Sequence, residues 1–153
     1  MSLVFQSLLG AAGAAGFALL FNVRGSKLAW VGAGGALGWM IYCILVPACG
    51  TFAAMFIATS TVAMFSEGLA RRLRTPVILL LVPMLIPLIP GRDLYAMMSA
   101  LIQGEQATLA DRARLLALQA GAIALGVLCL SSAVNSIQGL RRGTAPDGRK
   151  DTN

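Results

Sequence analysis

Uncharged apolar runs alternate with short charged segments along the whole chain. No charged residue occurs in residues 1–23, 28–66, 75–91 or 115–140. The second run is interrupted at residues 47–50, where Pro and Gly give a turn signal. A helix needs about 20 apolar residues to cross a bilayer. The pattern therefore predicts an all-α membrane protein with five transmembrane helices, near residues 3–22, 28–47, 51–69, 76–90 and 113–138.

The fourth predicted helix is the shortest and carries an unusual number of prolines. Its interior prolines are Pro83, Pro87 and Pro90, and Gly91 follows the last of them. An interior proline removes an amide donor and clashes with the carbonyl four residues earlier. The carbonyls of Leu79, Pro83 and Ile86 are therefore expected to lack their helical partners.

Two interpretations of this broken segment stay open. Lipid tolerates irregular backbone only where protein or an aqueous cavity covers it. Secondary transporters use broken helices near the middle of the membrane to bind substrates and ions. The alternative is a kinked helix with a purely structural role.

Lysine and arginine are unevenly distributed among the predicted loops. If the N-terminus lies outside, the inner segments carry two of these residues in loop 22–27, three in loop 67–75 and four in the tail. The outer region 91–114 carries three. Cytoplasmic loops carry the excess of Lys and Arg. The distribution therefore predicts five spans with the N-terminus out and the C-terminus in.

Composition supports a membrane protein of one domain. Hydrophobic residues make up 58% of the chain and charged residues 12%, with a mean hydropathy of +0.79. We predict one transmembrane domain over residues 1–140 and a polar, disordered cytoplasmic tail over 141–153. The net charge of +6 is spread between apolar runs. It therefore indicates membrane orientation and lipid contact rather than a nucleic-acid partner.

Motifs for catalysis and metal binding are missing. The chain has no histidine, and its three cysteines show no CxxC spacing, so we predict no metal and no cofactor. Serine-hydrolase, zinc-protease and Walker A motifs are also absent. We therefore expect neither an enzyme nor a chain that drives transport with ATP by itself.

Asp93 is the most interesting charged residue, because it stands between the broken helix and a short helical pattern over 94–102. One interpretation makes it an ordinary N-cap. The other places the positive end of that helix against an anionic substrate group, with Arg92 as a further contact. Within the fifth helix, Gln119 and Asn135 either bond to a neighbouring helix or line a path.

Other side chains suggest packing and surface roles. The pairs Gly34/Gly38 and Ala12/Gly16 have the spacing of closely packed membrane helices. Trp30 fits an interfacial anchor, whereas Trp39 lies in mid-span and either packs or faces a cavity. Glu67 precedes Arg71 by four residues, which predicts an exposed ion pair on one helix.

Several segments together resemble the threonine/serine exporter family, in its small separate subunit. They are Gly16–Val23 (GFALLFNV), Leu28–Trp39 (LAWVGAGGALGW), Ile86–Tyr95 (IPLIPGRDLY) and Met97–Ala100 (MMSA). The resemblance covers residues 10–105. It departs from the family pattern at Arg24, and again at Arg92 and Asp93, which add charge beside the suspected site.

The resemblance implies a bacterial inner-membrane protein that exports amino acids or, in members with two separate subunits, dicarboxylates. It implies the proton gradient as the energy source. It also implies a larger five-span companion subunit, or self-association in its place. An odd number of helices in each half fits the inverted-repeat arrangement of secondary transporters.

We therefore predict one subunit of a secondary exporter for small carboxylate-bearing metabolites. The expected substrate site consists of Pro83, Pro87, Pro90 and Gly91 in the broken helix, Asp93 and Tyr95 at the start of the next helix, and Asn22 at the cytosolic end of the first. The alternative is a non-transporting subunit that stabilises or assembles with a partner membrane protein. That alternative predicts a proline-rich segment buried in protein without access to water.

Overall fold

The computed structural model describes residues 3–143, apart from the side chains at positions 133, 135 and 137–143. The elements are α1 (Leu3–Leu20), α2 (Ser26–Leu73), α3 (Val77–Leu85), the 3₁₀ turn η1 (Ile86–Leu88), α4 (Gly91–Gln103) and α5 (Gln106–Gly143). Within this described part all regular structure is helical, which confirms the predicted all-α class. The predicted tail lies mostly outside the described residues, as does the side chain of Asn135.

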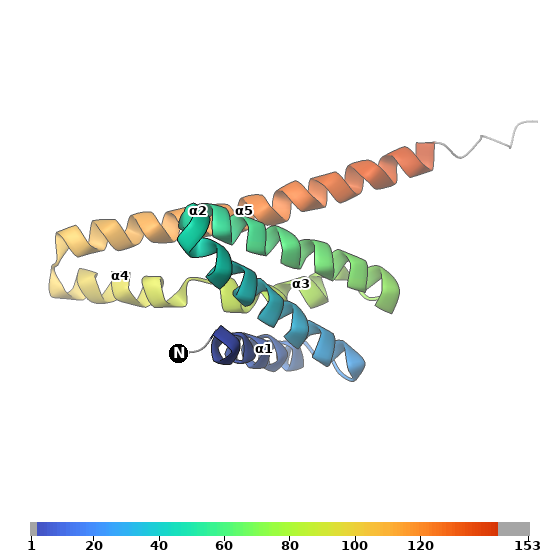
Figure 1. Ribbon diagram of the computed structural model, residues 1–153, viewed down its shortest axis with the longest axis horizontal. Coiled ribbons are helices and arrows are strands. Elements are labelled where there is room, and N and C mark those ends of the chain that lie inside the picture. The colour runs from blue at the N-terminus through green and yellow to red at the C-terminus, as the bar shows by residue number, and fades with distance from the viewer. Residues whose placement is uncertain (1–2, 144–153) are drawn as a thin grey trace, which may run out of the picture.

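The long helix α2 is sharply broken at Gly50. This residue has φ 78° and ψ 170°, whereas its flanking segments are helical. That combination belongs to a region of backbone space open essentially to glycine alone. Figure 1 shows the chain turning back at this point, so that the two arms of α2 run in different directions. The interruption predicted at residues 47–50 is confirmed, and its break lies at Gly50.

Several helices are long and apolar enough to cross a membrane. Within the described part these are α1, α2 and α5 up to Ser132, or four spans if the bent pair of Val77–Leu88 and Gly91–Gln103 counts as one. In that count the whole of α2 is one helix of 48 residues, although it is broken at Gly50. The exact number of five spans stays a prediction.

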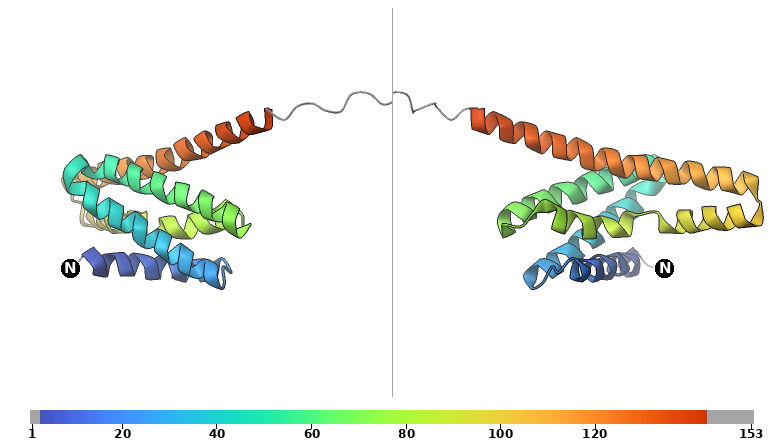
Figure 2. Two further views of the ribbon diagram at one scale, coloured as in Figure 1. Left: turned by 45° about the vertical axis from the view of Figure 1, so that its right-hand side comes forward. Right: turned by 180° about the vertical axis from the view of Figure 1, so that it is seen from behind.

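The polar connection predicted between the fourth and fifth spans is largely helical instead. Helix α5 begins at Gln106 rather than near residue 113. Only a short turn joins it to α4, where Gly104 has φ 72° and the Glu105 N–H donates to the Ala100 carbonyl at 3.0 Å. This is a Schellman ending. Figure 2 shows α4 and the first part of α5 as a hairpin that extends beyond α1 and α2.

A glycine-rich face of the first arm of α2 packs tightly against α1, α3 and the second arm of α2. A Cβ added at Gly34 would lie 2.5 Å from Met84 Sδ, and one at Gly35 would lie 2.5 Å from Ala14 Cβ. A Cβ at Gly38 would lie 2.6 Å from Val62 Cγ2. The packed face predicted from Gly34 and Gly38 is therefore confirmed, and its neighbours belong to the same chain.

The Ala12/Gly16 pair differs from this face. A Cβ added at Gly16 would meet no described atom within 4 Å. Instead, the buried side of α1 is formed by Gly10, Ala14 and Ala18. The small residues at 12 and 16 thus point away from the described helices.

We expect Gly35→Ala to destabilise the fold and Gly16→Ala to leave it intact. The new methyl at position 35 would overlap Ala14, and overpacking of this kind costs about 1–3 kcal/mol. At position 16 the methyl has space, and alanine favours a helix over glycine. Thermal unfolding in a mild detergent measures both effects. Equal melting temperatures for the two variants would contradict the close approach of α1 and α2.

Candidate functional site

The backbone between α3 and α4 is irregular but well hydrogen-bonded. The Ile86 carbonyl has no α-helical partner, as expected, because residue 90 is a proline; it accepts the Ile89 N–H at 3.1 Å instead. A 3₁₀ turn supplies the bond that Pro90 cannot make. Pro90 then adopts φ −77° and ψ 57°, and the Gly91 N–H donates to the Ile89 carbonyl at 2.7 Å. This inverse γ-turn separates the α3–η1 segment from α4, and the two are bent by 53°.

Helix α4 begins at Gly91, which changes the role of Asp93. No side chain caps this helix, and Asp93 lies inside its first turn. The N-cap interpretation is therefore wrong. The first N–H groups of a helix have no intrahelical acceptor and carry the positive end of its dipole. The start of α4 is consequently a favourable place for negative charge.

The Asp93 carboxylate is bound by two side chains of α5. Its Oδ1 accepts a hydrogen bond from Arg112 Nη1 at 3.0 Å, and its Oδ2 accepts one from Gln119 Nε2 at 3.1 Å. Gln119 is buried and Asp93 is largely buried, whereas Arg112 is half-exposed. Gln119 thus bonds to the neighbouring helix α4, which was one of the two roles predicted for it. We call these three residues the Asp93 cluster.

The Asp93 cluster and the helix break line a single cavity of about 600 Å³. Its walls come from α1, both arms of α2, the break, α4 and α5, and its lining residues are Gln6, Trp39, Tyr42, Met55, Pro87, Leu88, Ile89, Pro90, Gly91, Arg92, Asp93, Arg112 and Gln119. Among the described residues, two buried polar atoms here have no hydrogen-bond partner, Trp39 Nε1 and Gln119 Oε1. Since buried polar groups are normally paired, these atoms favour a bound molecule or water in the cavity.

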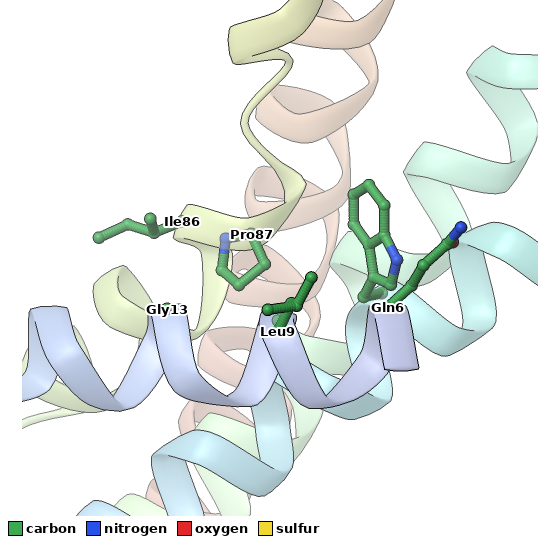
Figure 3. Close-up of a pocket in the computed structure, with 7 residues that line it drawn as sticks. Gln6, Leu9, Gly13, Ile86 and Pro87 are labelled. Carbon is green, nitrogen blue, oxygen red and sulfur yellow. The ribbon is translucent and has the colours of Figure 1, made fainter. Parts of the chain in front are cut away.

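An apolar cleft of about 330 Å³ adjoins this polar cavity (Figure 3). The two spaces share Gln6, Trp39 and Pro87, and the cleft adds Leu9, Gly10, Gly13 and Ile86. Figure 3 shows Pro87 of the break facing α1, close to Leu9. Pro87 therefore lies in the wall between an apolar space and a polar one.

The structure brings together four of the seven predicted site residues. Pro87, Pro90, Gly91 and Asp93 all line the polar cavity. Outside it lie Pro83, which is buried within α3, Tyr95, which is 78% exposed, and Asn22, which is exposed.

Asn22 has a clear structural role at its own position. It follows the end of α1 with φ 59°, and its N–H donates to the Leu19 carbonyl at 2.9 Å. Asparagine tolerates this left-handed conformation better than most residues.

Further residues that line the cavity were not part of the predicted substrate site, among them Gln6, Trp39, Tyr42, Arg112 and Gln119. Arg112 was assigned to a polar connection, and Gln119 had two open roles. Gln6 and Tyr42 are polar groups in long apolar runs, which is a signal for function in membrane segments. Trp39 was expected to pack or to face a cavity, and it does both, since its ring lies 5.7 Å from that of Tyr42.

Other predicted polar features have ordinary roles. Arg71 Nη2 lies 3.0 Å from Glu67 Oε1, which confirms the predicted ion pair within one helix. The described part of the chain contains no group of three His, Cys, Asp or Glu side chains placed to hold a metal ion. The Cys43 thiol donates to Gln6 Oε1 at 3.6 Å, at the rim of the two cavities.

Comparison with known proteins assigns a family to this arrangement. The family model described as "Threonine/Serine exporter, ThrE" matches residues 6–133, so the match includes α5 and its part of the cavity. Neither a curated protein nor a solved structure gives a match. The long apolar helices agree with a multi-pass membrane protein, and the family consists of exporters rather than enzymes. The chain therefore belongs to the threonine/serine exporter family.

Proposed function

We propose that this chain is one subunit of a secondary exporter that binds small amino acids, such as threonine and serine, in the polar cavity at the helix break. One observation carries the proposal: the break, the start of α4 and the Asp93 cluster line the same space. A volume of about 600 Å³ lies within the range of small-molecule sites, roughly 300–1,000 Å³.

The polar groups of this cavity suit a substrate with a carboxylate. The first N–H groups of α4 and the guanidinium groups of Arg92 and Arg112 attract negative charge. Trp39 Nε1 adds a donor without a partner among the described residues. The two arginines also favour a second candidate substrate, a dicarboxylate.

The proton gradient is the proposed energy source. The sequence contains no Walker A loop to bind ATP, and the family resemblance points to proton-linked export. Carboxylates inside membrane proteins commonly carry protons along a transport path. Among the described residues, Asp93 is the one carboxylate that lines the cavity.

We propose five spans with the N-terminus out and the C-terminus in, in a bacterial inner membrane. Two contacts support this arrangement. Lys27 Nζ donates to Thr75 Oγ1 at 2.6 Å, so the two basic loops lie at the same end of the bundle. The contact between Gln6 and Cys43 brings the start of α1 toward the opposite end, near the break at Gly50.

Reporter fusions at both ends of the chain are expected to reveal opposite sides. Alkaline phosphatase should be active at the N-terminus, and green fluorescent protein should be fluorescent at the C-terminus. Fusions in loops 22–27 and 67–75 provide inside references, because these loops carry five of the Lys and Arg residues. Both ends on one side would exclude an odd number of spans.

The alternative of a non-transporting subunit is less well supported. It requires a proline-rich segment packed fully within protein. Pro87 and Pro90 instead line a cavity that contains two unpaired polar atoms. The proposed exporter still needs a second half, either a larger companion subunit or another copy of this chain.

Efflux from preloaded cells tests the proposed function. Cells that express the chain, alone or with a candidate companion subunit of the same family, are loaded with labelled threonine, serine or succinate. Efflux is then followed with and without a proton uncoupler. We expect efflux of an amino acid above that of an empty vector, and a loss of this excess with the uncoupler. Equal efflux from cells with the vector and cells with the transporter would exclude the function.

A further inference from the structure

We propose that the ion pair between Asp93 and Arg112 recognises the charged head of an α-amino acid, and that substrate binding splits this pair. The substrate carboxylate takes Arg112, and its ammonium group takes Asp93 and Gln119 Oε1. This inference rests on the proposed function and names the residues that recognise the two charged groups of its substrate.

The geometry provides the two opposite charges that a zwitterion needs. Asp93 Oδ1 and Arg112 Nη1 lie 3.0 Å apart, and both side chains line the cavity. A guanidinium has five N–H donors, so Arg112 can bind a second carboxylate in a forked arrangement. Its side chain is 41% exposed, which leaves room for such an exchange. The nearby start of α4 favours the same carboxylate.

Gln119 supplies the second, independent observation. Its side chain is 5% exposed, and its Oε1 has no hydrogen-bond partner among the described residues. The bond from Nε2 to Asp93 Oδ2 fixes the orientation of the amide, so an acceptor rather than a donor remains unpaired. A buried acceptor without a partner calls for an N–H or O–H donor, and in this cavity the Tyr42 hydroxyl beside Gln119 or a bound ligand can supply it.

An ammonium group fits this acceptor and a dicarboxylate does not. The ammonium has three donors, which suffice for Asp93 and Gln119 together. A dicarboxylate at neutral pH brings only acceptors and would also face the negative charge of Asp93. The Asp93 cluster therefore selects amino acids, although Arg92 and Arg112 alone would also suit dicarboxylates.

Splitting the pair also has a mechanical consequence. Among the described elements α4 packs against α5 alone. In the same part of the chain, every side-chain hydrogen bond that joins α4 to another helix involves Asp93. A substrate that takes over the Arg112 bond leaves the Gln119 bond as the remaining side-chain link of Asp93 to α5, and this loosens the start of α4 beside the helix break.

Substrate analogues with either charged group removed test this proposal. Efflux of labelled serine is competed from inside the cell with 3-hydroxypropionate, which lacks the ammonium, and with ethanolamine, which lacks the carboxylate. The variants are Asp93→Asn, Gln119→Leu and Arg112→Gln. Glu67→Gln is the matched control, because it removes a carboxylate from a 3.0 Å ion pair outside the cavity.

We expect the unaltered protein to prefer serine over 3-hydroxypropionate. Asp93→Asn and Gln119→Leu should reduce this preference by about tenfold or more, since a hydrogen bond to a charged group is lost. Arg112→Gln should instead reduce the preference for serine over ethanolamine. Glu67→Gln should change neither ratio. Immunoblots of membranes establish that each variant inserts, and Gln119→Leu provides the test if Asp93→Asn does not accumulate or exports nothing.

The possible results of this experiment distinguish a failure of the inference from a failure of the proposed function. Serine efflux by the unaltered protein, with unchanged preferences in the Asp93 and Gln119 variants, would overturn the inference and leave the exporter intact. An unaltered protein that exports succinate but not serine would also overturn the inference. Absence of efflux for every substrate would remove the proposed function, and this inference with it.

Discussion

Replacing Pro87 and Pro90 together by alanine is expected to reduce substrate efflux to background while the protein still inserts. The two alanines restore N–H donors that can bond to the carbonyls of Pro83 and Ile86. An interior proline costs a helix about 3 kcal/mol or more, so a continuous helix from α3 to α4 becomes favourable. Straightening the 53° bend moves the start of α4, and Asp93 with it, out of the cavity.

Pro76→Ala is the matched control for this double variant. Pro76 stands just before α3 and lines neither the polar cavity nor the apolar cleft. Its replacement removes a proline without joining two helices, so efflux should persist. The double variant should melt at the same temperature as the unaltered protein or at a higher one. Unchanged efflux from the double variant would show that the break is purely structural.

The chain is expected to transport nothing on its own and to become active only with a second half. Helix α4 leaves several large apolar side chains exposed, namely Leu94, Tyr95, Met98, Leu101 and Ile102. Two residues that line the cavity, Gly91 and Arg92, are themselves exposed. Lipid does not tolerate an uncovered polar path, so a second half is needed to cover this side of the cavity.

Purification in a mild detergent tests this requirement. The chain is prepared alone and together with a candidate companion subunit of the same family, and each sample is reconstituted into liposomes loaded with serine. We expect efflux from the larger assembly and background leakage from the chain alone. A single-chain species that transports serine by itself would contradict the prediction. A stable homo-oligomer with efflux would identify self-association as the source of the second half.

The sequence located the broken helix because its signal is local. Pro87, Pro90 and Gly91 lie within a few residues of one another, and each acts on the backbone beside it. The bonding of Ile86 was not predictable in the same way. A 3₁₀ turn can replace a lost α-helical bond, and whether it does depends on the packing of Leu88 against the glycine face of α2.

The partners of Asp93 depend on the tertiary fold. Arg112 and Gln119 are 19 and 26 residues away along the chain, and they reach Asp93 only because α4 and α5 form a tight hairpin. The charged residues before Leu115 predicted a loop, but in the structure they lie in the first turns of α5. The structure of residues 106–112, predicted as a loop and observed as the first turns of α5, therefore decided whether Arg112 could be recognised as part of the site.

Gly50 controls the sidedness of everything that follows it. A straight helix over the 48 residues of α2 would be roughly 70 Å long at about 1.5 Å per residue, more than twice the thickness of the hydrocarbon core. The conformation that divides it is closed to residues with a side chain. In the proposed topology, fusing the two arms would replace two crossings by one. The helix break, the Asp93 cluster and α5 would then face the opposite side of the membrane, so the glycine at position 50 sets the orientation of every element that follows it.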